Sequence, residues 1–177
     1  MSQTCVDMPV YELQQGEVYI AKHPVLVTTL LGSCVSVCLF SRVHGVGAIC
    51  HALLPLQANR HCPNNLRYVE CAVEEMLRGM GLLGIHHEDI EAKIFGGGRM
   101  FPAADGYCAL SKDIGSQNVR AAREKLSALK VKIVAERVGG PVGIRLVFNS
   151  GTGDVLVKRI GAHGRTAGAH IKEVFGR

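Results

Sequence analysis

The sequence lacks tryptophan, and only 5% of its 177 residues are aromatic. Its net charge is +5, but the basic residues are scattered and no basic run is interleaved with aromatic side chains. Nucleic-acid-binding domains gather basic residues on one face, often beside aromatic side chains. We therefore expect no nucleic-acid partner. Hydrophobic residues make up 47% of the sequence and charged residues 20%, which is typical of a folded domain with a core.

The sequence also lacks a hydrophobic run that could cross a bilayer. Its longest apolar stretch, residues 25–40, is 16 residues long and is interrupted by threonine, glycine and serine. A spanning helix needs about 20 mainly apolar residues. The N-terminal segment has no hydrophobic stretch behind a basic start, as a signal peptide would have. We expect no membrane insertion and a cytoplasmic protein.

Metal-binding motifs are missing as well. The sequence has no C-x-x-C pair and no H-E-x-x-H, and the clusters at residues 86–89 and at His61–Cys62 lack ligand spacing. We expect these clusters to be solvated loops and the protein to need neither metal nor cofactor. The seven cysteines are odd in number, so they cannot all pair, and without an export signal they are expected to be reduced thiols.

Hydrophobic periodicity predicts one α/β domain. Alternating or β-branched runs between turn residues predict strands, and apolar residues spaced by three and four predict two helices. The expected strands are 17–22, 25–30, 34–40, 46–53, 91–95, 131–138, 144–149 and 155–160, and the expected helices are 66–80 and a second one ending near 129. Two helices cover only part of so many strands, so we expect a mixed two-sheet β-sandwich with helices packed outside. The domain should span residues 1–160, followed by a basic, glycine-rich tail over 161–177.

Cys34 and His51 are the first candidates for chemistry. A hairpin turn centred between Arg42 and Val43 would place Cys34 directly opposite His51 on one face of the sheet. A thiol beside an imidazole is the arrangement that nucleophilic catalysis requires, because the thiolate reacts and the histidine takes its proton. The turn at Gly32–Ser33 before Cys34 can aim backbone N–H groups at a developing oxyanion.

Other cysteines and glycines have plainer interpretations. Cys38, Cys50, Cys71 and Cys108 are expected to be buried hydrophobic residues, as cysteine usually is. The triple glycine of KIFGGGRM lacks the lysine and hydroxyl residue of a phosphate-binding loop. We expect it to let a backbone segment pass close to the active face.

An ordered set of motifs resembles one family. TLLGSCVSVCLF, GAICHALLP, EAKIFGGGRM, IGSQNV, VAERVGG and TGDVLVKRI occur in the order and spacing of the CheD family of chemoreceptor glutamine deamidases. The resemblance runs from about Gly16 to Ile160. Three positions depart from the family pattern: Gln117, Arg137 and Arg145.

The resemblance implies a catalytic triad. The family's nucleophile falls on Cys34, its general base and acid on His51, and the threonine that orients the histidine on Thr28, six residues before the cysteine. The oxyanion would be held by backbone N–H groups near Gly32 and Ser33. The implied fold is an α/β sandwich that is similar to glutamine-deamidating bacterial toxins.

The resemblance also implies the substrate. Selected glutamines on the cytoplasmic helices of methyl-accepting chemoreceptors would become glutamates with release of ammonia, through a thioester and without a cofactor. The first alternative is an adaptor that regulates a CheC-type phosphatase, in which case Cys34 would be dispensable. The second is a redox-sensing or metal-binding cysteine protein, although Cys34 and Cys38 in one strand lie about 13 Å apart, too far for a disulfide.

Overall fold

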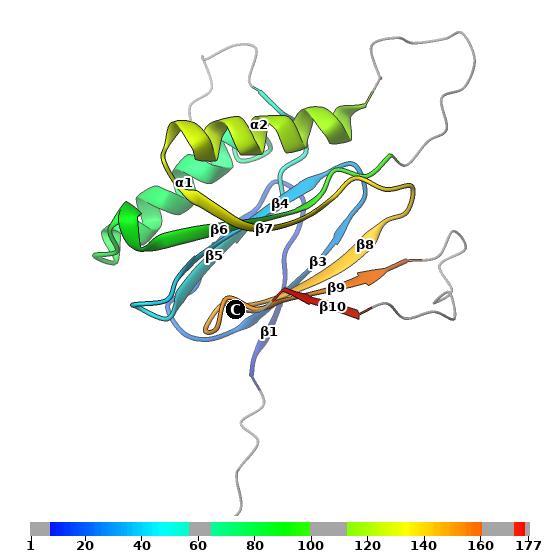
Figure 1. Ribbon diagram of the computed structural model, residues 1–177. Helices are drawn as coiled ribbons and strands as arrows, with labels where there is room; N and C mark the ends of the chain where they lie inside the picture. Colours follow the sequence, from blue (N-terminus) through cyan, green and yellow to red (C-terminus); the bar gives the residue numbers. More distant parts are fainter. Residues whose placement is uncertain (1–7, 57–64, 100–112, 161–171, 176–177) are drawn as a thin grey trace, which may run out of the picture.

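The computed structural model describes residues 8–56, 65–99, 113–160 and 172–175. Within these ranges the chain forms two five-stranded sheets and two α-helices. Both helices cover the sheet that contains β4, β5, β6 and β7, and the second sheet lies beneath it (Figure 1). This arrangement confirms the predicted α/β class, with two mixed sheets and helices on the outside.

Sheet A takes its strands from the beginning and the end of the chain, and sheet B takes most of its strands from the middle. Sheet A has the order β1 (Val10–Glu12), β3 (Leu26–Leu31), β8 (Ile144–Asn149), β9 (Val155–Arg159) and β10 (Lys172–Phe175). Sheet B has the order β2 (Val18–Ile20), β5 (Val46–Cys50), β4 (Val35–Ser41), β6 (Ile90–Gly96) and β7 (Lys132–Val138). The helices are α1 (Val69–Leu82) and α2 (Ile114–Ala128), and His87–Asp89 form a 3-10 turn. No helix among the described residues is long and apolar enough to span a membrane.

The central strands β4 and β5 of sheet B are buried on both faces, which explains why their sequences read as nearly continuous apolar runs. Along β4, Val35, Val37 and Leu39 point toward the helices and join one core with α1 and α2. Cys38, on the other face, joins Phe95 and side chains of sheet A in a second core between the sheets. Each side chain of β4 therefore belongs to one of two cores. Odd-numbered residues face the helices, and even-numbered residues face sheet A.

Two short strands were missed by the sequence analysis. β1 has three exposed residues and pairs in parallel with β3, so it carries no apolar alternation. β10 comes from the expected tail and pairs antiparallel with β9. Residues 172–175 therefore extend sheet A.

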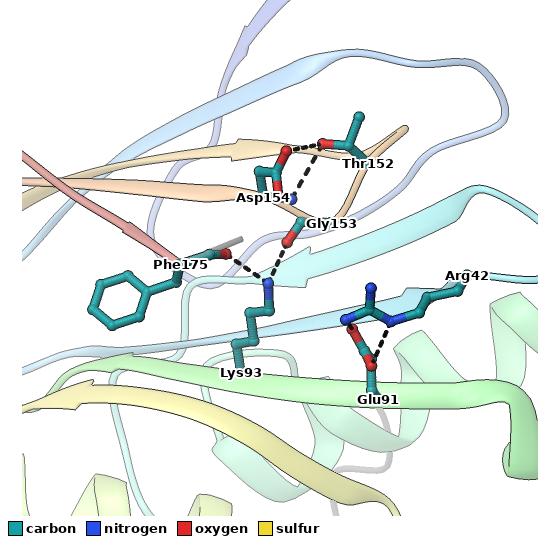
Figure 2. A network of polar contacts seen from close by, with 7 residues as sticks. All are labelled: Arg42, Glu91, Lys93, Thr152, Gly153, Asp154 and Phe175. Atoms are coloured by element: carbon teal, nitrogen blue, oxygen red, sulfur yellow. Dashed lines mark hydrogen bonds and ion pairs between the residues drawn. The ribbon is translucent and has the colours of Figure 1, made fainter. Parts of the chain in front are cut away.

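A buried lysine fastens the end of β10 to sheet B (Figure 2). Lys93 of β6 is 3% exposed, and its Nζ donates hydrogen bonds of 2.7 Å to the carbonyls of Gly153 and Phe175. Burial lowers the pKa of this amine from its ordinary value. The ring of Phe175 packs edge-on against Phe95, with centroids 5.3 Å apart. The amine thus joins the two sheets at the side away from the helices.

The glycine run at the end of β6 permits a close backbone approach, as expected. The amide of Gly97 donates to the carbonyl of Cys34 at 2.7 Å, and that of Gly98 to Gly32 at 2.8 Å. Gly96 has φ +98°, and a Cβ there would lie 2.3 Å from the carbonyl oxygen of Cys34. Only glycine fits between these two segments.

This packing predicts different effects for two glycine substitutions. Gly84 has a φ of +80°, and a Cβ added there would meet no atom within 4 Å. Gly84→Ala should therefore lower the free energy of unfolding by about 1–2 kcal/mol, the cost of a left-handed conformation for alanine. Gly96→Ala should lower the free energy of unfolding by about 1–3 kcal/mol more, because the methyl group displaces Cys34. Urea denaturation of both variants measures the difference, and equal losses would contradict the close approach.

Candidate active site

Cys34 and His51 lie at the open end of the β4–β5 hairpin. Cys34 immediately precedes β4, and His51 immediately follows β5. Cys34 is half-buried, whereas His51 is only 2% exposed. The two residues therefore lie at the ends of two inner strands of sheet B, with Cys34 partly exposed to solvent and His51 buried.

The hairpin register differs from the predicted one by two residues. Leu39 pairs with Ala48, and a bridge joins Val35 to Ala52, so His51 falls opposite Ser36 rather than Cys34. The loop is the reason: it spans residues 42–45 and ends at Gly45, whose φ is +61°. A shift of two residues preserves the face of every side chain, so Cys34 and His51 still share a face as diagonal neighbours.

The hydroxyl group of Thr29 contacts the ring of His51. The Oγ1 of Thr29 lies 2.8 Å from Nδ1 of His51, and Thr29 is 2% exposed. The resemblance assigned this role to Thr28, whose side chain lies on the outer face of β3 because side chains alternate along the strand. Val27, Thr29 and Leu31 form the buried face toward sheet B, which is the signal that would have selected Thr29.

The hydrogen bonds of Thr29 determine which nitrogen of His51 carries the proton. A threonine hydroxyl has one hydrogen, and that of Thr29 is donated to the carbonyl of Leu13 at 2.8 Å. Its oxygen must then accept from Nδ1–H of His51. In the neutral ring this leaves Nε2 with a lone pair. Nε2 is buried and has no hydrogen-bond partner among the described residues.

Burial favours the neutral form of both reacting groups. It lowers the pKa of His51 from 6.5 to about 4, since the imidazolium would lose its hydration. It raises the pKa of the Cys34 thiol, although the backbone amide of Cys34 opposes this shift. At pH 7 the resting pair is therefore a thiol and a neutral imidazole that can accept its proton.

The backbone before Cys34 is fixed through its carbonyls. The Gly32 carbonyl accepts from Gly98, and the Ser33 carbonyl accepts from Nδ2 of Asn118 at 3.0 Å. In a trans peptide the C=O and the following N–H point in opposite directions. The N–H groups of Ser33 and Cys34 therefore point away from these partners, and neither donates to another described residue. Two amides at one turn can bind an anionic oxygen.

The remaining candidates lie apart from this cluster. Cys38 and Cys50 are buried, and Cys38 pairs with Ile49. Cys71 is half-buried in α1, and Cys108 and the His61–Cys62 pair lie outside the described residues. The cluster at 86–89 forms the exposed 3-10 turn. In the described part of the chain, no three His, Cys, Asp or Glu side chains gather as a metal-ligand set.

Comparisons with known proteins agree on one family. The family model "CheD chemotactic sensory transduction" matches residues 53–159. A probable chemoreceptor glutamine deamidase CheD of Maridesulfovibrio salexigens is 39% identical over 170 residues, covering 92% of this chain and 99% of the relative. Similarly named proteins of Geobacter sulfurreducens (39% identity, 86% of this chain and 91% of the relative) and Methanococcus maripaludis (32% identity, 85% and 95%) also match.

The lowered pKa of His51 predicts acid sensitivity. Between pH 6.5 and about 4 the unfolded chain binds a proton on His51 that the folded chain does not, so stability should fall as the pH falls through this window. The full loss is on the order of 3 kcal/mol, from about 1.4 kcal/mol per pKa unit. Urea denaturation at several pH values should show a weaker slope for His51→Gln. The exposed control His23→Gln should keep the wild-type slope, and equal slopes in all three proteins would contradict the assignment.

Proposed function

The chain belongs to the CheD family, and on this premise we propose that it hydrolyses glutamine side-chain amides of chemoreceptors to glutamate. The proposed substrate is supported by the relatives, which are named as probable chemoreceptor glutamine deamidases. The observation that supports the chemistry is the buried Nε2 of His51, whose lone pair faces no partner while Nδ1 is held by Thr29. A half-buried thiol on the same face supplies the nucleophile.

The first half of the reaction forms a thioester. Nε2 of His51 takes the proton from Sγ of Cys34 as the sulfur attacks the amide carbon of the glutamine. The resulting oxyanion accepts hydrogen bonds from backbone N–H groups at the turn, those of Ser33 and Cys34 being free to donate; Gly32 anchors the turn through its carbonyl. His51 then returns the proton to the leaving nitrogen, the C–N bond breaks and ammonia departs.

The second half releases glutamate. Water attacks the thioester carbon, and Nε2 of His51 takes one proton from that water. The tetrahedral intermediate collapses with cleavage of the C–S bond, and the Cys34 thiolate recovers its proton from His51. The carboxylic acid then loses its proton to solvent. Throughout the cycle the Thr29 oxygen keeps Nδ1–H in place and so keeps Nε2 directed at the reacting atoms.

The proposed substrate also defines where the protein would act. Chemoreceptor glutamines that become methylation sites lie on cytoplasmic helices, so the proposal requires a cytoplasmic enzyme. Binding of a CheC-type phosphatase would be a second interaction of the same protein. An adaptor function would not require Cys34, so substitution of this cysteine distinguishes the enzymatic function from the adaptor function.

Mass spectrometry of a chemoreceptor cytoplasmic fragment tests the proposed reaction. Each conversion of amide to acid adds about 1 Da, and the wild-type protein should produce it while Cys34→Ala and His51→Ala should not, because nucleophile and base are lost. The core variant Cys38→Ala and the surface variant His23→Ala serve as matched controls and should retain activity. If Cys34→Ala matched the wild type on receptor fragments, the adaptor function would replace the enzymatic one.

Two adjacent threonines provide a stricter test. Thr29→Val removes the hydroxyl that holds His51 and should lower kcat about 10- to 100-fold, the range expected when a reacting group is misplaced by roughly 1 Å. Thr28→Val makes the same chemical change one residue earlier, on the outer face of β3, and should leave kcat within about threefold of wild type. The reverse order of effects would restore the role first assigned to Thr28.

A further inference from the structure

A single amide group spans the two segments that contain the proposed nucleophile and base. Asn118 of α2 is fully buried, and its Nδ2 donates hydrogen bonds to the carbonyls of Ser33 at 3.0 Å and Leu53 at 2.9 Å. Ser33 precedes Cys34 by one residue, and Leu53 follows His51 by two. Both hydrogens of the Asn118 amide are therefore used, one on each side of the site.

The two hydrogen bonds of Asn118 lie beyond the point where backbone pairing between the β4 and β5 segments ends. The last contact between the two segments is the bridge from Val35 to Ala52. Beyond it, the chains toward Ser33 and Leu53 are connected to each other through α2. Because Cys34 and His51 are diagonal neighbours, small movements of either segment change the separation between Sγ and Nε2.

The same hydrogen bond orients the proposed oxyanion donor. Holding the carbonyl of Ser33 fixes the plane of the Ser33–Cys34 peptide, and the N–H of Cys34 is part of that plane. If the peptide rotated, this N–H would no longer point away from α2. Donors of this kind act through their fixed direction, since they stabilise charge without having to reorganise during the reaction.

We infer that Asn118 is a positioning residue for the amide hydrolysis proposed above, on which this inference rests. Its amide sets both the direction of the Cys34 N–H and the spacing between the Cys34 and His51 segments. Two facing carbonyls require two donors, so the amide cannot turn over without placing its oxygen against a carbonyl oxygen. The Oδ1 of Asn118 is buried and has no partner among the described residues, so the two donated bonds alone define its orientation.

The helix that carries Asn118 is itself anchored beside the site. The side chain of Asp113 caps the N-terminus of α2 by accepting from the amide of Ser116 at 3.2 Å. Close packing is visible one residue beyond Asn118, where the Cγ2 of Val119 lies 2.4 Å from the place a Cβ of Gly97 would occupy. A firmly held helix can transmit a fixed position to the Asn118 amide.

The test uses two variants of Asn118 and one matched control. Asn118→Ala removes both donors, and Asn118→Asp keeps the volume but offers carboxylate oxygens to the two carbonyls. The control is Asn149→Ala, which removes the 3.0 Å hydrogen bond from the amide of Gly151 to Asn149 at the β8–β9 turn, away from the site. Steady-state deamidation of a chemoreceptor fragment gives kcat and KM, thermal unfolding reports folding, and the pH profile of Cys34 alkylation by iodoacetamide reports the thiol without any substrate.

Both Asn118 variants should lower kcat about 10- to 100-fold with KM within about threefold, because the reacting groups are misplaced while the binding surface is intact. Their Cys34 alkylation profiles should shift away from that of the wild type, and Asn149→Ala should change neither. The inference is overturned if folded Asn118 variants keep wild-type kcat and alkylation profiles, or if activity falls only in step with stability in all three variants. If the wild type itself deamidates no receptor fragment, the proposed function fails, whereas the alkylation profiles still decide whether Asn118 positions Cys34.

Discussion

The hydrogen bond from the Thr29 hydroxyl to the Leu13 carbonyl is the constraint on which the site depends. Once that hydrogen is committed, the Thr29 oxygen can only accept from His51, and the ring must carry its proton on Nδ1. The backbone of His51 is held in the same region, because its amide donates to Glu17 and its carbonyl accepts from Gly16. The segment that follows β1 thus fixes both the position and the tautomer of the imidazole.

This constraint explains why the protein needs two sheets. His51 extends from sheet B and Thr29 from sheet A, so the contact between them crosses the interface between the sheets. The shared core, which includes Leu31, Cys38 and Phe95, holds the two sheets in a fixed position relative to each other. Packing of this core fixes the position of Thr29 relative to His51 and so the direction of the Nε2 lone pair. A proton acceptor needs such a fixed direction toward its donor.

Sequence patterns predicted the layers of the fold better than its details. Every expected strand and helix exists, and the faces assigned to residues along β4 were right because the predicted pairing with β5 differs from the observed one by an even number of residues. The predicted pairing of β4 with β5 was wrong by two residues. Periodicity alone cannot distinguish two registers that place the same side chains on the same faces, and the loop that ends at Gly45 determines which one forms.

The features near the site that sequence patterns did not select have a related cause. Thr28 and Thr29 are chemically identical neighbours: the family resemblance pointed to Thr28, on the outer face of β3, whereas the hydroxyl that contacts His51 is that of Thr29, on the buried face. β1 is exposed and β10 follows a glycine-rich segment, so neither had an apolar pattern. Asn118 is a polar residue beside the apolar stripe of α2, and only its two carbonyl partners, distant in the sequence, reveal why it is buried.

Nitrogen NMR of the His51 ring tests the central claim most directly. Long-range proton–nitrogen correlation of the folded protein at pH 7, assigned with His51→Gln, separates the two neutral tautomers and the imidazolium. The structure predicts a neutral ring with the proton on Nδ1 and a pKa well below 6.5. A ring with its proton on Nε2, or one that is charged at pH 7, would contradict the account, because no lone pair would then be available to Cys34.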